Sequence, residues 1–274
     1  MARGVALKVG VVGCGSIGRT LARKLAPFKP VSRITFFDLD PSRARALAAL
    51  SLRYRVAPSL AGLVRGSDLV VESASQAAAR EVAPLALKAG RDVLVMSVGA
   101  LADDRFWRGL RKVRERTGAT ILLPSGALAG LEAVASAASA GLREVSLTTR
   151  KPPRALAGSP YLQKKAFDPA KVRAPTVVFR GSARRAVQLF PANINVAAAL
   201  AIAGLGFDRT RVTIIADPRA RNNEHEVVAK GDFGTLKCRV DNAPFPDNPK
   251  TSYLAALSAV SSVKNAALGI HIGP

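Results

Sequence analysis

Long apolar runs are missing from this chain of 274 residues. No stretch approaches the roughly 18 uninterrupted apolar residues that a membrane-spanning helix needs. Near the N-terminus, Lys8 and the glycines after it interrupt the apolar residues, so this segment makes a poor secretory signal. We therefore expect a soluble cytoplasmic protein with no membrane partner.

Cysteine and histidine are also scarce, with 2 residues of each. Cys14 and Cys238 are far apart in the sequence, and neither is flanked by other residues of the metal-binding type. This excludes a small disulfide scaffold and predicts no metal site. Few cysteines without a framework are typical of a protein from a reducing compartment.

Acidic and aromatic residues are few beside the basic ones. The 41 Lys and Arg residues exceed the 19 Asp and Glu residues by 22, whereas only 5% of the chain is aromatic. Proteins that bind single-stranded nucleic acid combine positive charge with aromatic side chains that stack on bases, and no basic segment here is interleaved with such side chains. We therefore expect no nucleic-acid partner, and a basic surface that affects solubility and attracts anions.

The first part of the chain alternates between strand and helix patterns, which predicts a parallel sheet with crossover helices. Asp40 and Pro41 are suited to the N-cap and first position of one helix. The expected strands are 9–12, 34–37, 69–72, 92–96 and 120–123, and the expected helices are 17–25, 41–50, 76–89 and 103–116. We expect residues 1–124 to form a Rossmann-type, doubly wound α/β domain.

After Pro124 the pattern changes to strands with few regular helices between them, which is typical of a mixed or antiparallel sheet. We expect a second, α+β domain over residues 125–248 and a C-terminal segment, 249–274, with a final helix. The expected strands are 144–149, 176–179, 212–216, 226–229 and 235–240, and the expected helices are 131–140, 195–203 and 253–268.

A G-x-G-x-x-G motif begins at Gly13, directly after the first expected strand and at the start of the first helix. Gly13 permits a tight turn, Gly15 lets a pyrophosphate approach the backbone, and Gly18 lets the helix pack closely against the strand. The amides of Ser16 and Ile17 at the helix N-terminus would then bind the phosphates. The motif predicts a dinucleotide-binding loop.

Asp38 follows the second expected strand, twenty residues past Gly18. A carboxylate at this point can accept hydrogen bonds from both ribose hydroxyls of an adenosine. Its charge would repel a 2′-phosphate, so Asp38 favours NAD as the cofactor. Arg43 and Arg45 lie just downstream, and they leave NADP possible.

His225 is the candidate for proton transfer, because an imidazole ionises near neutral pH. It lies in the polar segment 217–226, which we interpret as a loop between two apolar strands. A surface histidine or a lone metal ligand would fit the composition equally well. The other histidine, His271, belongs to the C-terminal tail, where we expect no catalytic role.

Five segments of the sequence together resemble the L-aspartate dehydrogenase family, in the expected order and over nearly the whole chain. The segments are 13–18, 124–130, 150–153, 190–197 and 222–226. The resemblance implies a dinucleotide-binding domain joined to an α+β domain that holds the substrate and forms a homodimer, with a C-terminal helix that returns to the first domain. It also implies that His225 is the active-site histidine and that Ala129 and Asn195 contact the nicotinamide cofactor.

The activity implied is the oxidation of L-aspartate to iminosuccinate with NAD or NADP, followed by hydrolysis to oxaloacetate and ammonia. In the family, iminosuccinate can feed the synthesis of NAD. A dicarboxylate substrate needs cations and donors, and our candidates are Lys151 and the neutral amide of Asn222. Both residues could equally belong to the general basic surface.

Two other functions stay open. Another two-domain dehydrogenase, similar to homoserine dehydrogenase or dihydrodipicolinate reductase, would act on a related substrate derived from aspartate, although the segment 222–226 fits aspartate dehydrogenase better. A cofactor-sensing protein that binds nucleic acid through its basic surface would show steeply salt-dependent duplex binding and no turnover.

Overall fold

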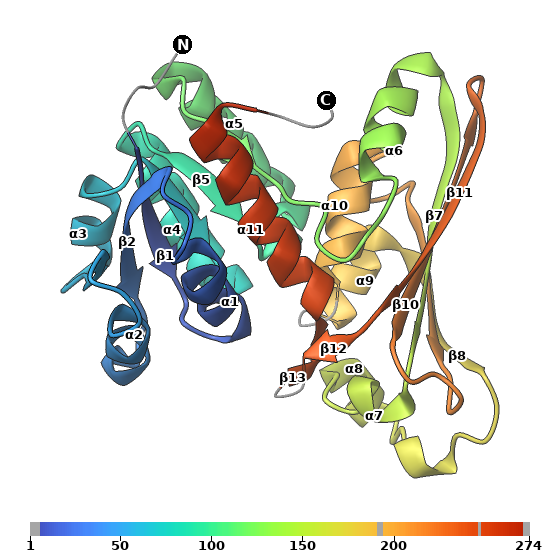
Figure 1. The fold of residues 1–274 in the computed structure, drawn as a ribbon. Coiled ribbons are helices and arrows are strands. Elements are labelled where there is room, and N and C mark those ends of the chain that lie inside the picture. Colours follow the sequence, from blue (N-terminus) through green and yellow to red (C-terminus); the bar gives the residue numbers. More distant parts are fainter. Residues whose placement is uncertain (1–5, 191–193, 246–247, 271–274) are drawn as a thin grey trace. The chain divides into compact units, whose positions relative to one another are not determined.

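The computed structural model describes residues 6–190, 194–245 and 248–270 (Figure 1). The chain separates into two compact units, one formed by Met1–Pro124 with Ala256–Ile272 and the other by Ser125–Ala255. Part of the segment 190–197 and His271 lie outside the described residues. In the portion that is described, no helix combines the length and the apolarity needed to cross a membrane.

The first unit contains a six-stranded, entirely parallel sheet with the strand order β3-β2-β1-β4-β5-β6. Its strands are β1 (Leu7–Val12), β2 (Val31–Phe37), β3 (Tyr54–Val56), β4 (Leu69–Glu72), β5 (Asp92–Val95) and β6 (Ile121–Leu122). Its helices are α1 (Ser16–Leu25), α2 (Pro41–Ala48), α3 (Leu60–Arg65), α4 (Gln76–Lys88), the 3₁₀ helix η1 (Val98–Ala102), α5 (Asp104–Thr117) and most of α11 (Tyr253–Leu268). The expected doubly wound Rossmann-type sheet is confirmed.

The central strand β1 is buried on both of its faces, which is why its sequence is almost continuously apolar. Val9 and Val11 belong to a core cluster that also contains Leu21 of α1 and Val263 of α11. The opposite face is so close to α3 that a Cβ atom at Gly10 would lie 2.4 Å from Leu63 Cδ2. Helices therefore cover both faces, as a parallel sheet requires.

The start of α2 agrees with the prediction. Asp40 is its N-cap, the Asp40 side chain accepts a hydrogen bond from the Ser42 amide, and Pro41 occupies the first turn. The short strand β3 and helix α3 were not expected from the sequence. The cue for α3 was Ser59, which caps this helix by accepting a hydrogen bond from the Gly62 amide.

The second unit is built on a five-stranded mixed sheet with the order β11-β10-β7-β9-β8, in which only β7 and β9 run parallel. Its strands are β7 (Leu142–Lys151), β8 (Thr176–Ser182), β9 (Arg211–Ala216), β10 (Asn223–Gly231) and β11 (Gly234–Asn242), with the small pair β12 (Pro244–Phe245) and β13 (Asn248–Ser252). Its helices are α6 (Leu131–Ala137), η2 (Ala138–Ala140), α7 (Pro153–Leu156), α8 (Pro160–Lys164), η3 (Pro169–Lys171), α9 (Ala183–Leu189) and α10 (Asn195–Ala203). The expected α+β architecture is confirmed, but α7, α8 and α9 were not expected.

The interpretation of the segment around His225 as a loop is wrong. His225 lies inside β10, which begins at Asn223 and alternates between buried and partly exposed residues. Glu224 and Glu226 made the segment look like a solvated loop, yet they occupy only the outer positions of this alternation. His225 itself is 3% exposed. The period of two, which starts at Asn223 and continues through Val227, was the overlooked signal.

A buried carboxylate connects the ends of two central strands in the first unit. Glu72 ends β4 and is completely buried. Its side chain accepts hydrogen bonds from the amides of Ala74 and Ser75 after β4, at 2.8 and 3.0 Å, and from the amide of Ser97 after β5, at 3.0 Å. Burial raises the pKa of Glu72 despite these donors.

We predict that Glu72→Ala lowers the free energy of unfolding by about 2 kcal/mol or more, because three amides lose their acceptor in the interior. Denaturant unfolding of the variant measures the change. The matched control is Glu81→Ala, which removes an exposed carboxylate from α4 and should change the same quantity by less than about 0.5 kcal/mol. Equal losses in the two variants would contradict a bridging role for Glu72.

Candidate functional site

The glycine loop of the first unit has little room for side chains at two of its three glycines. Gly13 has a φ of +94°, and a Cβ atom there would lie 2.8 Å from the Ala74 amide nitrogen. A Cβ atom at Gly18 would lie 2.3 Å from the Gly13 carbonyl oxygen. At Gly15, in contrast, a Cβ atom would meet nothing within 4 Å. The loop is therefore packed against the β4 turn and α1 and is open at Gly15.

The N-terminus of α1 offers an anion site at this opening. Gly15 is the N-cap residue, no side chain caps the helix, and its first turn contains no acidic residue. The amides of Ser16 and Ile17 belong to the first turn, where helix geometry leaves N–H groups without helical acceptors. Phosphate oxygens suit such a terminus, and the open space at Gly15 gives them access. The loop therefore fits the pyrophosphate of a dinucleotide.

Asp38 lies beside the same loop, directly after β2. Its carboxylate accepts hydrogen bonds from the Cys14 amide at 2.7 Å and the Asp40 amide at 2.9 Å. These two bonds fix the orientation of the carboxylate but use only part of its acceptor capacity. Asp38 can therefore still accept hydrogen bonds from ribose hydroxyls.

Burial, and to a smaller extent the charge of Asp38, raises the pKa of the Cys14 thiol to about 12, so this thiol stays protonated.

In the second unit, the register of the sheet brings polar side chains together at one end of the sheet face that carries His225, hereafter the inner face. Thr149 of β7 pairs with His225 of β10, and Val240 of β11 pairs with His225 on the other side. The neighbouring row contains Lys151, Asn223 and Asn242 on the same three strands, because Glu224 pairs with Arg150 and Asn223 with Asn242. All five polar residues of these rows are at most 3% exposed.

The same face is apolar further along the strands. Leu147 pairs with Val227 of β10 and with Val212 of β9, and all three are buried. Helices α6, α9 and α10 lie over this face (Figure 1). A strand alternates its side chains between two faces, so Thr149 and Lys151 must follow Leu147 inward. The polar rows are thus a continuation of the core and are not part of the outer surface.

The imidazole of His225 is held by a side chain from the neighbouring strand. Thr149 Oγ1 lies 3.0 Å from His225 Nδ1. Burial, and to a smaller extent the charge of Lys151, lowers the pKa of His225 to about 3. The ring is therefore neutral near pH 7. In the tautomer in which Nδ1–H donates to Thr149 Oγ1, the lone pair of Nε2 can accept a proton.

Lys151 does not belong to the general basic surface. It ends β7 with 3% exposure, and burial lowers the pKa of its ammonium group to about 8. A buried cation attracts an anion that comes close to it, because the interior screens the charge weakly. Lys151 thus has the property expected of a residue that receives a carboxylate.

Two neighbouring asparagines differ in their position. The predicted substrate residue Asn222 precedes β10 and is only partly buried. Asn223 is 1% exposed, faces inward beside His225 and donates from Nδ2 to Ser252 Oγ at 3.4 Å. Sequence reasoning missed Asn223 and Thr149. The signal that could have found them is the shared parity of these positions with His225 and Lys151 along each strand.

The two residues that the family resemblance connects with the cofactor lie in neighbouring segments of this unit. Ala129 is exposed in the segment 125–130 (hereafter the Ser125–Gly130 segment), and Asn195 begins α10. A Cβ atom at Gly126, within the first segment, would lie 3.9 Å from Val196, the residue after Asn195. The fold therefore brings these two segments into contact.

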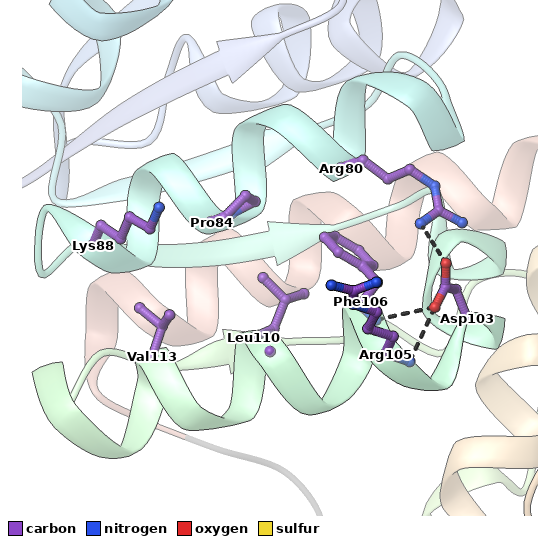
Figure 2. Close-up of a pocket in the computed structure, with 9 residues that line it drawn as sticks. Arg80, Pro84, Lys88, Asp103, Arg105, Phe106, Leu110 and Val113 are labelled. Carbon is purple, nitrogen blue, oxygen red and sulfur yellow. Dashed lines mark hydrogen bonds and ion pairs between the residues drawn. The ribbon is translucent and has the colours of Figure 1, made fainter.

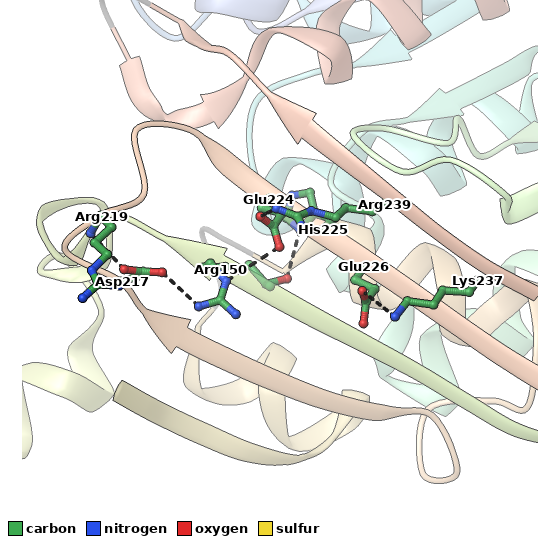
Figure 3. A network of polar contacts seen from close by, with 9 residues as sticks. Arg150, Asp217, Arg219, Glu224, His225, Glu226, Lys237 and Arg239 are labelled. Carbon is green, nitrogen blue, oxygen red and sulfur yellow. Dashed lines mark hydrogen bonds and ion pairs between the residues drawn. The ribbon is translucent and has the colours of Figure 1, made fainter. Parts of the chain in front are cut away.

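Ion pairs connect the strands on the outer face, opposite His225 (Figure 3). Arg150 contacts Asp217 at 2.9 Å and Glu224 at 3.7 Å, and Arg239 also pairs with Glu224. The Asp217 carboxylate in turn accepts a hydrogen bond from the Arg219 amide at 2.8 Å. This network crosses β7, β10 and β11, so it supports the register that aligns the inner polar rows.

A separate groove of about 420 Å³ lies between α4 and α5 in the first unit (Figure 2). Its apolar lining includes Phe106 and Leu110, and the ion pair between Arg80 and Asp103 lies at one end. Asp103 also caps α5. None of the predicted site residues lines this groove, so we assign it no part in the candidate site.

Metal ligands do not cluster in the described portion of the chain. No group of three or more His, Cys, Asp or Glu residues there has the arrangement needed to hold a metal ion. His225 itself is hydrogen-bonded to a threonine and lies near a lysine. Its surroundings therefore suit proton transfer better than metal binding.

Comparison with known proteins covers both units. Residues 13–124 match the family described as "Homoserine dehydrogenase, NAD binding domain", and residues 132–266 match "Aspartate dehydrogenase, C-terminal". The L-aspartate dehydrogenases of Methanosarcina barkeri and Methanosarcina acetivorans are each 45% identical to this chain, over 97% of its length and 99% of theirs.

A solved structure is also similar to the whole chain. The crystal structure of aspartate dehydrogenase from Thermotoga maritima matches with a TM-score of 0.76 and 27% identity, over 97% of this chain and 99% of that one. The glycine loop agrees with the match of residues 13–124 to an NAD-binding domain. The chain belongs to the L-aspartate dehydrogenase family.

Proposed function

We propose that this protein is an L-aspartate dehydrogenase that uses a nicotinamide cofactor, with NAD preferred. The observation that carries the proposal is the buried Lys151 beside the neutral His225 on one face of the sheet. A cation that receives a carboxylate and a base that receives a proton are what the oxidation of an amino dicarboxylate needs. Family membership supports the same assignment.

Lys151 would bind one carboxylate of the substrate through a charge-assisted hydrogen bond. Because burial lowers the pKa of Lys151, an arriving carboxylate also stabilises its protonated form. Asn222 stays our proposal for a neutral donor at the entrance to β10. The excess of 22 positive charges on the chain would favour the approach of such an anion.

His225 would accept a proton, either from the substrate amine or from a water that attacks the imine. This role requires the tautomer in which Nδ1–H donates to Thr149 Oγ1, so that Nε2 carries the free lone pair. The charge of Lys151 lowers the pKa of His225, and a bound dicarboxylate would offset that charge. Substrate binding would therefore make His225 a stronger base.

When bound, oxidised nicotinamide supplies the hydride acceptor for the substrate α-carbon. The overall change is L-aspartate plus NAD⁺ giving iminosuccinate, NADH and a proton. Water then converts iminosuccinate to oxaloacetate and ammonia. The residues of this chain contribute binding and orientation: Gly13, Gly15 and Gly18 shape the phosphate site, and Ala129 and Asn195 would contact the cofactor.

We also propose that the enzyme is a homodimer and supplies iminosuccinate for the synthesis of NAD. Both proposals rest on the family resemblance. A cytoplasmic location would keep the two cysteines, which form no disulfide, in their reduced state.

An assay of nicotinamide reduction with a panel of amino acids tests the proposal. We expect activity with L-aspartate, and we expect His225→Ala to lower kcat by about 100-fold or more because the proton acceptor is lost. His271→Asn, which changes the other histidine, is the matched control and should retain full activity. Preferential turnover of homoserine, or an unchanged rate in His225→Ala, would refute the assignment.

The electrostatic relation between Lys151 and His225 gives a second prediction. In Lys151→Met the pKa of His225 should rise above about 3, since the smaller cause of its depression is removed, yet burial should keep it below the ordinary value of 6.5. Titration of the imidazole signals by NMR measures both values. Lys237→Met, on the outer face of β11, should leave the His225 pKa unchanged. A wild-type His225 that is protonated at pH 6 would contradict the described surroundings.

The preference for NAD is tested by Asp38→Ser. The variant loses the acceptor for the ribose hydroxyls and the repulsion of a 2′-phosphate, so the KM for NAD should rise about tenfold while the KM for NADP changes little. Asp40→Ser is the matched control, because serine also caps a helix and Asp40 is exposed. If Asp38→Ser raised both KM values equally, Asp38 would not contact the ribose.

A further inference from the structure

Asn242 has a buried oxygen atom to which no described residue donates a hydrogen bond. The residue ends β11 and is 3% exposed. Its Nδ2 donates to the Ala127 carbonyl oxygen at 3.2 Å, whereas its Oδ1 accepts no hydrogen bond within the part of the chain that the structure describes. The bond from Nδ2 to a carbonyl fixes the orientation of the amide, since only the nitrogen can donate. An unsatisfied buried acceptor costs on the order of 1–3 kcal/mol, so its presence needs an explanation.

The same strand holds the Ser125–Gly130 segment at a second point. Cys238 Sγ donates to the Ala129 carbonyl oxygen at 3.1 Å. Gly130 lies so close to this thiol that a Cβ atom there would be 2.7 Å from Cys238 Sγ. Nδ2 of Asn242 and the thiol of Cys238 thus both anchor the segment. Anchoring uses only Nδ2 of Asn242, so it does not explain why Oδ1 is buried without a donor among the described residues.

The surroundings of Oδ1 indicate what kind of group it would bind. Asn242 shares a row with Asn223 and Lys151, and His225 lies in the adjacent row. Lys151 can only donate, and it fits a carboxylate. Oδ1 can only accept, so a ligand that pairs with it must bring an N–H or O–H group. A row with a donor cation at one end and an acceptor at the other fits a ligand with both a carboxylate and an amine.

We propose that Asn242 Oδ1 accepts a hydrogen bond from the α-amino group of bound L-aspartate and thereby selects amino dicarboxylates over dicarboxylates without an amine. This inference rests on the proposed function and adds a substrate-binding residue to it. Lys151 binds a carboxylate, His225 accepts one proton of the amine, and Asn242 orients another N–H bond. A neutral amide can hold both the ammonium and the free amine, so it does not oppose the loss of the proton.

The test compares L-aspartate with succinate, which is the same dicarboxylate without the amine. Their dissociation constants are measured by titration calorimetry in the presence of saturating NADH, with which neither compound can be oxidised. In Asn242→Ala we expect the Kd for L-aspartate to rise about tenfold while the Kd for succinate changes less than about threefold. Asn242→Asp keeps the shape of the side chain but loses the donor to the Ala127 carbonyl oxygen. In this variant we expect the preference for L-aspartate over succinate to increase, because a carboxylate attracts the ammonium.

Cys238→Ala serves as the matched control for anchoring. It removes the other contact to the Ser125–Gly130 segment, and it should leave the ratio of the two Kd values unchanged. An equal rise of both Kd values in Asn242→Ala would overturn the proposal and leave Asn242 as an anchor of the segment only. A wild-type protein that neither binds nor oxidises L-aspartate would instead overturn the proposed function, and the inference with it.

Discussion

The burial of a lysine ammonium group in the polar rows at the end of an inner sheet face is the constraint on which the second unit depends. Lys151 follows Leu147 and Thr149 inward because a strand alternates its side chains. Burial of this charge lowers the pKa of Lys151. The charge of Lys151, in turn, is the smaller of the two causes that lower the pKa of His225. A dicarboxylate that bound beside Lys151, as proposed, would offset this charge and relieve both effects at once.

The first unit depends on a different constraint. At the carboxyl ends of its central strands, backbone segments pack closely against one another. Gly13 and Gly18 leave no space for side chains, and Ser73 Oγ donates to the Gly13 carbonyl oxygen at 2.9 Å. Glu72 connects the turn after β4 with the turn after β5. These contacts fix a rigid frame around the one open position, Gly15, where a phosphate can reach the helix amides.

The large excess of basic residues has a limited role inside the two units. Among the lysines and arginines whose burial the structure describes, Lys151 alone is buried. Other basic side chains form exposed or half-exposed pairs, such as those of Arg143 with Asp232 and Lys230 with Glu144. Such pairs contribute little to stability individually. The excess therefore acts mainly through the field around the molecule, which favours the approach of anionic ligands.

The sequence by itself determined the alternating strands and helices of the first unit except β3 and α3, the glycine loop, the cap at Asp40, and the helices α10 and α11, because each depends on neighbours within a few residues. It did not place His225 in a strand, since two glutamates concealed the alternation. Only the tertiary structure decided that Thr149, 76 positions away, contacts this histidine. It also decided that Asn223 faces inward while Asn222 precedes the strand. Strand order and register create these contacts, and a shift of one residue would turn every side chain to the other face.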